Sequence, residues 1–268
     1  MRKRVKRFFD NFWICIRRPE MLVLPGQLAF FFILSVVPIL TIISYGVVSF
    51  HLSFDILTEF LTRSFGSEIV NLLIPHINDL SMSIGFMLTI IVGLIFASNG
   101  AAAIIVTSNS IYQIEDKGFL RRRIKAFIMT IFMIILFLFI LLVPLFGDLI
   151  VRIATNINYN SKEGMVQIIS ILNGPIAWFI IFFLVKLLYT MAPDKNIPAN
   201  KTTYGALFTT IGWVIATSIY SFYINNIANY SLFYGSLANI IILMLWTYLL
   251  AYIFTIGLAL NNHRDNNK

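Results

Sequence analysis

The chain is poor in charge, cysteine and histidine, and each scarcity excludes a class of protein. Charged residues make up only 12% of the 268 residues, whereas soluble domains carry about a quarter, so charge cannot cover a water-facing surface. The single cysteine, Cys15, excludes an intramolecular disulfide framework. The three histidines lie far apart in the sequence, so we predict no metal site.

Motifs of catalysis and energy coupling are also missing. The sequence has no G-x-x-x-x-G-K-[ST] motif, which excludes a P-loop ATPase, and no H-E-x-x-H motif. Ser98 and Ser236 lie beside small residues, but neither has a recognisable basic partner, which argues against a serine hydrolase. The acidic residues fall outside the long apolar runs, so a pump using buried carboxylates is not expected. We therefore predict no enzyme, no catalytic residue and no cofactor.

Apolar residues dominate the composition instead. They form 59% of the chain, and the mean hydropathy is +0.85. A membrane-spanning helix needs about 20 mainly apolar residues, and six such runs are present. We predict an all-α polytopic membrane protein whose six transmembrane helices cover residues 27–50, 84–108, 126–149, 166–191, 204–225 and 237–260.

The basic residues indicate the orientation of these spans. Sixteen of the 20 Lys and Arg residues lie on the side that holds both termini, and only Arg63, Arg152 and Lys162 lie in the opposite loops. Basic loops stay in the cytoplasm, so we predict a multi-pass membrane protein with both termini cytoplasmic. The expected partners are anionic lipid headgroups at the cytoplasmic face, not nucleic acid. No sequence feature indicates a protein partner or a homo-oligomer.

Three segments outside the spans complete the predicted organisation. Residues 1–26 place aromatic and basic side chains at helical spacing, as in a cytoplasmic interfacial helix, which Pro25 and Gly26 would end. Residues 51–83 are acidic and amphipathic and predict short helices on the outer surface. The six-helix domain covers residues 27–262, and residues 263–268 form a cytoplasmic tail.

Polar and helix-breaking residues inside or beside the spans are the candidate substrate contacts, because polar groups in hydrocarbon mark helix contacts, cavities or pathways. Asn99 and Asn109 lie ten residues apart, which places them on neighbouring helix faces about 80° apart. Each could equally join helices through hydrogen bonds, and each proline could simply kink its helix. Gly93, Ala97 and Ala101 form a small-residue stripe that favours close helix packing. The full candidate set is Pro38, Asn99, Asn109, Asn173, Lys186, Tyr234, Ser236 and Asn239.

Several short stretches stand in a distinctive order and spacing: residues 28–32 with Pro38, 98–102 with Asn109, 188–193, 204–206, 234–236, Trp246 and Gly257. Together they resemble the YihY/BrkB family of bacterial inner-membrane proteins. The sequence departs from the family pattern at Thr203–Tyr204, where many relatives have a proline, and at Leu258–Leu260, which replaces the more usual Ala-Glu. The resemblance implies a six-helix, multi-pass protein of the bacterial cytoplasmic (inner) membrane. The family is virulence-associated, is suspected of transport and was formerly labelled a tRNA-processing ribonuclease.

Two functions from different classes remain open. Kinked helices and uncharged polar groups without coupling carboxylates favour a transporter or flippase of a lipid or other amphiphile. The alternative is a non-transporting membrane scaffold or envelope assembly factor, whose small-residue faces contact protein partners. Ribonuclease activity is not expected, because the sequence lacks clustered metal ligands and its basic loops are short.

Overall fold

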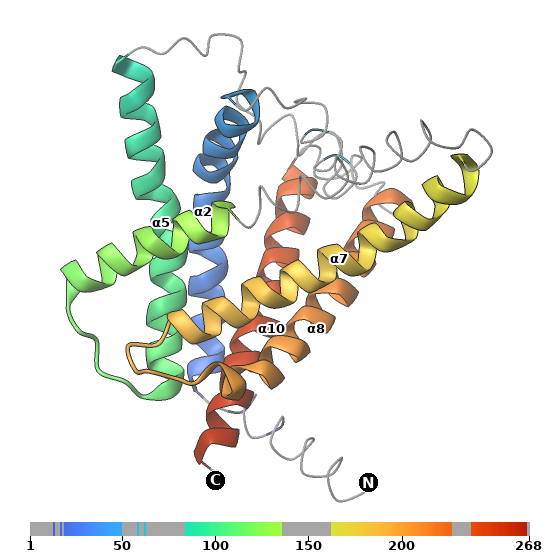
Figure 1. The fold of residues 1–268 in the computed structure, drawn as a ribbon. Helices are drawn as coiled ribbons and strands as arrows, with labels where there is room; N and C mark the ends of the chain where they lie inside the picture. The colour runs from blue at the N-terminus through green and yellow to red at the C-terminus, as the bar shows by residue number, and fades with distance from the viewer. Residues whose placement is uncertain are drawn as a thin grey trace, which may run out of the picture.

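The computed structural model describes Trp13, Arg17, Pro19 to Ser49, Thr58, Thr62, and residues 84–135, 162–226 and 237–266. Within these residues the chain is helical, with no strand (Figure 1). A further helix runs over residues 119–135, where the described part ends. The other helices are α2 (Glu20–Ser49), α5 (Ile84–Tyr112), α7 (Lys162–Met191), α8 (Ala199–Asn226) and α10 (Leu237–Asn266).

Four of these helices are long and apolar enough to cross a membrane. They contain the stretches Met21–Leu40, Ile90–Tyr112, Ala199–Tyr223 and Ile241–Asn262, which correspond to the first, second, fifth and sixth predicted spans. The fourth predicted span lies on α7, which contributes a shorter apolar stretch, Pro175–Met191. The third, 126–149, is described only to residue 135.

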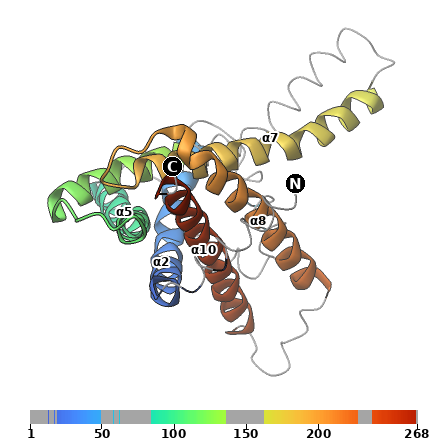
Figure 2. The same cartoon turned by 90° about the horizontal axis from the view of Figure 1, so that it is seen from below.

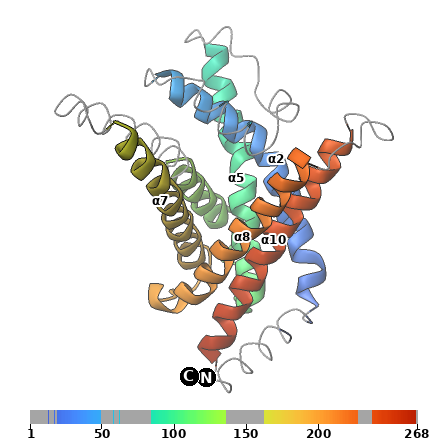
Figure 3. The same ribbon diagram turned by 90° about the vertical axis from the view of Figure 1, so that its right-hand side faces the viewer.

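The helices pack in a spatial order that differs from their order in the chain. α2 packs against α5 on one side and α10 on the other, α10 packs against α8, and α8 packs against α7 (Figure 2). α8 and α10 run side by side (Figure 3). The core between these helices is apolar, with fully buried side chains such as Leu28, Ile104 and Phe254.

The outer faces of the helices are apolar as well. On α8, an exposed side chain recurs every fourth residue at Leu207, Ile211, Ile215 and Ile219. A helical stripe of this kind would be unfavourable in water but is suited to contact with acyl chains. The exposed surface and the core therefore both fit a chain that is surrounded by lipid.

Small residues set the closest helix contacts. Gly93 lies against Pro38 of α2, and Ala97 and Ala101 are fully buried, so the predicted stripe is a packing face. Next to it, the Gly100 amide of α5 donates to Ser35 Oγ of α2 at 3.0 Å. A side chain at Gly100 would press on Ser35, which explains why α2 and α5 approach here at a glycine.

The ends of two helices differ from the prediction. α2 begins at Glu20 and continues through Pro25, so the break expected at Pro25 and Gly26 is absent. The reason is packing: Met21 and Leu24 are buried in the core, and a proline this close to a helix start removes few backbone hydrogen bonds. α10 continues past the predicted end at Leu260 to Asn266. Apart from Trp13, Arg17 and Pro19, the rest of the predicted interfacial helix lies outside the described residues, as does the external segment 51–83 apart from Thr58 and Thr62.

Candidate functional site

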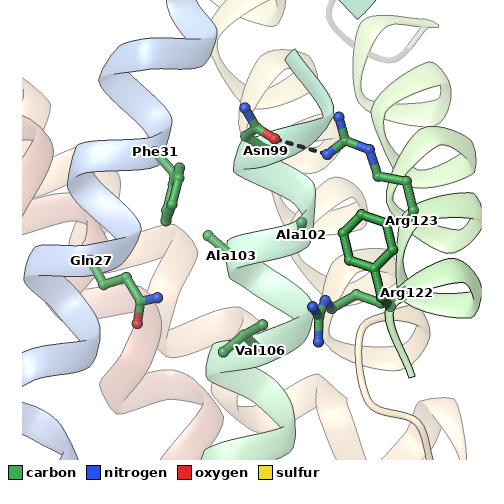
Figure 4. Close-up of a pocket in the computed structure, with 9 residues that line it drawn as sticks. Gln27, Phe31, Asn99, Ala102, Ala103, Val106, Arg122 and Arg123 are labelled. Carbon is green, nitrogen blue, oxygen red and sulfur yellow. Dashed lines mark hydrogen bonds between the residues drawn. The ribbon is translucent and has the colours of Figure 1, made fainter. Parts of the chain in front are cut away.

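A pocket of about 210 Å³ lies over one face of α5, between α2 and the helix of residues 119–135 (Figure 4). Its apolar wall comes from small or aromatic side chains, and its polar wall comes from Asn99, Gln27 and two arginines. The small side chains of Ala102 and Ala103 on α5 leave space for the pocket, and Phe31 of α2 borders it. The complete lining is Gln27, Phe31, Asn99, Ala102, Ala103, Val106, Phe119, Arg122 and Arg123.

Arg123 joins the 119–135 helix to α5 at this pocket. Its Nη1 donates to Asn99 Oδ1 at 2.8 Å, and its Nη2 donates to the Ile95 carbonyl at 2.8 Å. The guanidinium also lies 5.1 Å from the centre of the Phe127 ring, within the range of a cation–π contact. Asn99 is half-buried and thus serves both as a helix contact and as a pocket wall.

Arg122 is held by the loop that precedes its helix. It forms an ion pair with Asp116, whose carboxylate also accepts the Gly118 amide at 3.0 Å. Gly118 has a φ of 99°, a conformation that side chains rarely adopt, so a glycine suits this tight turn. The turn fixes where the helix begins and so places Arg122 and Arg123 beside α5.

A second polar cluster joins the ends of α5, α7 and the 119–135 helix. The Asn109 side chain donates to Asp194 Oδ2 and accepts from the Asp194 amide, both at 2.9 Å. Lys125 Nζ donates to Asp194 Oδ1 at 2.7 Å and to the carbonyls of Ala192 and Pro193 at 2.7 and 2.8 Å. Lys125 thereby satisfies carbonyls just beyond the end of α7 that no helical amide reaches.

Burial and hydrogen bonding act in opposite directions on the pKa of Asp194, which lies in the loop after α7. Burial alone would raise the pKa of this carboxyl, but the hydrogen bonds from Lys125 and Asn109 and the charge of Lys125 outweigh burial and lower the pKa from its ordinary value. The side chain is only 4% exposed. The cluster is therefore a joint between helices in which both carboxylate oxygens and the amide of Asp194 are paired.

The structure describes the side chains of four of the predicted site residues, and these four do not share one site. Asn99 lines the pocket, Asn109 is sealed by Asp194, and Pro38 packs against Gly93. Lys186 lies half-buried on α7, with its ammonium 5.9 Å from the centre of the Phe182 ring. Asn173 and Asn239 lie on α7 and α10, where their side chains are outside the described set, as are Tyr234 and Ser236 altogether.

Several residues with many hydrogen bonds in the structure have no recognisable role in the sequence. From the sequence alone, Arg122, Arg123 and Lys125 indicate only a cytoplasmic loop, and Asp194 is only an acidic residue outside the apolar runs. Their partners lie 24 or more residues away along the chain, so no local pattern reveals them, except for Arg122 with Asp116. Within the described residues, no group of three or more His, Cys, Asp or Glu residues could hold a metal ion.

The comparisons with known proteins agree with this membrane-embedded architecture. A family model described as Virulence factor BrkB matches residues 16–268. The chain belongs to the BrkB family. Ribonuclease-like protein YfkH of Bacillus subtilis is 30% identical over 244 residues, which cover 88% of this chain and 87% of the relative. A UPF0761 membrane protein of Pseudoalteromonas atlantica is 26% identical over 262 residues, covering 92% and 82% of the two chains.

Family membership and the apolar helices together identify a membrane protein. A UPF0761 membrane protein of Chromobacterium violaceum matches a smaller part, with 34% identity over 73 residues, or 27% of this chain and 18% of the relative. No solved structure matches the chain. The names of the relatives differ between a ribonuclease-like protein and a membrane protein, so the function has to be argued from the residues themselves.

Proposed function

We propose that the protein is a transporter or flippase that moves a lipid or another amphiphile across the bacterial cytoplasmic membrane. The observation that carries the proposal is the two-sided pocket on α5. Aromatic and small apolar side chains form one wall, and Asn99 and two arginines form the other. A cavity with apolar and polar walls beside lipid-facing helices suits a molecule that has both an apolar and a polar part.

The distribution of acidic residues supports a passive or exchange-type process. In the described helices, carboxylates occur only near helix ends, at Glu20, Glu163 and Asp265. Proton- or cation-coupled carriers commonly place such groups within the membrane. An amphiphile that moves down its own concentration gradient does not need a coupling ion, and so the transporter does not need carboxylates within the membrane.

Scrambling of a fluorescent phospholipid in reconstituted vesicles tests this function. Full-length protein is incorporated into liposomes that contain nitrobenzoxadiazole-labelled phosphatidylglycerol, and dithionite is added to quench the outer leaflet. We expect the protein to make inner-leaflet lipid accessible and Asn99→Leu to slow this exchange. Ser218→Ala, an exposed position on α8 whose hydroxyl bonds only the Val214 carbonyl of its own helix among the described contacts, is the matched control. Quenching no greater than in protein-free liposomes would contradict the proposal.

One observation favours the alternative of a non-transporting scaffold. Asn109, a candidate substrate contact, is occupied by Asp194, as expected of a residue that joins helices. Purification in a mild detergent separates the two functions. A stoichiometric protein partner favours a scaffold, whereas lipid that copurifies and is lost in Asn99→Leu favours transport.

A further inference from the structure

The two arginines of the pocket differ in how far their charge is neutralised. Arg122 is paired with the carboxylate of Asp116. Arg123 bonds only neutral oxygens, those of Asn99 and the Ile95 carbonyl, and among the described residues no carboxylate forms an ion pair with it. The pocket therefore contains a positively charged group that the described part of the protein orients without cancelling its charge.

One of the two present partners of Arg123 can be exchanged at little cost. The Ile95 carbonyl also accepts the Ser98 hydroxyl at 2.7 Å, so this carbonyl remains bonded when Arg123 turns away. A guanidinium has more N–H donors than these two hydrogen bonds use. Its planar fork matches two oxygens of a phosphate, and hydrogen bonds between charged groups are stronger than those to neutral acceptors. An anionic ligand would therefore compete well for Arg123.

The size and walls of the pocket restrict the ligand further. Its volume of about 210 Å³ lies below the roughly 300–1,000 Å³ of sites that enclose a whole drug-sized molecule. It can hold a headgroup, with the remainder of the ligand outside. Next to the arginines, Phe119 is 71% exposed and Ile95 is 41% exposed, so apolar surface continues from the pocket onto the outer face. A free anion would gain nothing from this surface, whereas acyl chains would.

We propose that this pocket binds the phosphate of an anionic phospholipid, with Arg123 as the main contact, Arg122 at its edge and the acyl chains along the exposed apolar face. This inference rests on the proposed function, since it names the substrate class of the same pocket. Asn99 is then a positioning residue, which holds the Arg123 guanidinium at the mouth of the pocket, where the phosphate binds.

Binding measured by native mass spectrometry tests the inference. Full-length protein in detergent is titrated with short-chain phosphatidylglycerol and, separately, with phosphatidylcholine of the same chain length. We expect phosphatidylglycerol to bind more tightly, and Arg123→Gln to weaken its binding by about tenfold or more, since charge-assisted hydrogen bonds are lost. Arg123→Lys keeps the charge without the fork and should restore part of the affinity.

Arg121→Gln is the matched control. Arg121 carries the same charge two residues from the pocket edge of Phe119, but it is exposed and does not line the pocket. It should change the affinity for phosphatidylglycerol by less than about twofold. An equal loss in Arg121→Gln and Arg123→Gln would show a general attraction to basic residues and overturn the inference. Thermal melting of Arg121→Gln and Arg123→Gln checks that both variants are folded. If Arg123→Gln is not folded, Arg123→Lys replaces it as the test variant.

Two further results would overturn the inference. Equal affinity for phosphatidylglycerol and phosphatidylcholine would exclude selection of an anion. Displacement of the lipid by an equal concentration of inorganic phosphate would identify a free-phosphate site in place of a lipid site. These failures are distinct from failure of the proposed function, which is decided by scrambling in vesicles whichever lipid is bound.

Discussion

At the scale of single residues, two asparagines of one helix illustrate what a polar group in an apolar span can do. Asn99 and Asn109 were predicted to lie on neighbouring faces of the second span, and their partners do lie on different elements: Arg123 on the 119–135 helix and Asp194 after α7. The helical period alone gives this difference in direction. Which asparagine borders a cavity could not be predicted, because that depends on side chains distant in sequence.

We expect replacement of these asparagines by leucine to separate stability from transport. Asn109→Leu leaves the Asp194 amide and one carboxylate oxygen without their partner, at a cost of about 1–3 kcal/mol each for buried groups. Its melting temperature in detergent should fall by several degrees. Asn99→Leu removes one hydrogen bond of Arg123, which keeps its hydrogen bond to the Ile95 carbonyl. The melting temperature of this variant should therefore fall less than that of Asn109→Leu, while its lipid scrambling slows. The opposite order of melting temperatures would contradict this assignment.

The ion pair of Asp194 with Lys125 predicts a pH dependence of stability. Because the pKa of Asp194 is lowered in the folded protein, its stabilisation is complete above the ordinary aspartate value of about 3.9 and is lost as the pH falls through the lowered pKa. Asp194→Asn should therefore lower the melting temperature at pH 7 by an amount that shrinks towards pH 3. Melting curves of both proteins between pH 3 and pH 7 measure this difference.

Asp116→Asn is the control for this titration. Its ion pair with Arg122 is more open to water, with the aspartate side chain 37% exposed against 4% for Asp194. An exposed pair contributes about 0–1 kcal/mol, so this variant should melt close to the wild-type temperature at every pH. A difference between wild type and Asp194→Asn that stays constant with pH would show that the carboxylate charge is not the cause.

At the scale of whole elements, the α8–α10 contact depends on two glycines. A Cβ at Gly205 would collide with the Gly257 carbonyl and lie 2.5 Å from the Asn261 amide nitrogen, whereas one at Gly93 would lie 3.9 Å from Pro38 Cβ. The backbone carbonyl cannot move aside without shifting a helix. Around this contact, the Gly205 amide donates to Asn261 Oδ1 at 2.7 Å, and the Tyr189 hydroxyl of α7 donates to the Phe254 carbonyl at 2.7 Å.

We therefore expect Gly205→Ala to force α8 and α10 apart and to destabilise the protein by about 1–3 kcal/mol or more, as overpacking does. Gly93→Ala, in ordinary contact with its neighbour, should be neutral or slightly stabilising, since alanine favours a helix by about 1 kcal/mol over glycine. Melting temperatures in one detergent compare the two. Equal stability of both variants would show that α8 and α10 can separate freely.

The presence of the membrane-spanning helices could be predicted from the apolar composition of their segments. Long apolar runs gave four helices of membrane-spanning length, because hydrocarbon requires the backbone to bond within its own segment. The helix ends were less predictable. α2 includes Pro25 because Met21 and Leu24 are drawn into the core, and α10 extends to Asn266 with Asn262 donating to the Ile111 carbonyl at 2.7 Å. Both outcomes depend on packing between helices, which a local pattern does not contain.

At the scale of the whole molecule, the helix ends group by direction. The start of α2, the end of α5, the start of α8 and the end of α10 all lie towards the lower end of the molecule in Figure 1. The loop after α5 begins at this end and the loop before α8 ends at it, and the two loops carry Lys117 and Lys195. Basic loops at one end are what the positive-inside rule expects of one membrane face. The pocket lies nearer this end, because Gln27 and Phe31 belong to the first half of α2 and Ala102 and Val106 to the second half of α5.

Labelling of single cysteines tests the orientation. In a Cys15→Ser background, we expect cysteines at the exposed positions Glu115 and Lys195 to resist a membrane-impermeant maleimide in intact spheroplasts and to react in inverted vesicles. Thr62→Cys, an exposed position in the segment predicted to be external, should show the opposite pattern and controls for reagent access. If Glu115→Cys reacts in intact spheroplasts, the orientation is reversed and the arginine pocket faces the outer leaflet. In that case lipid would enter the pocket from the outer leaflet, and the labelled phospholipid of the scrambling assay would have to be placed in that leaflet.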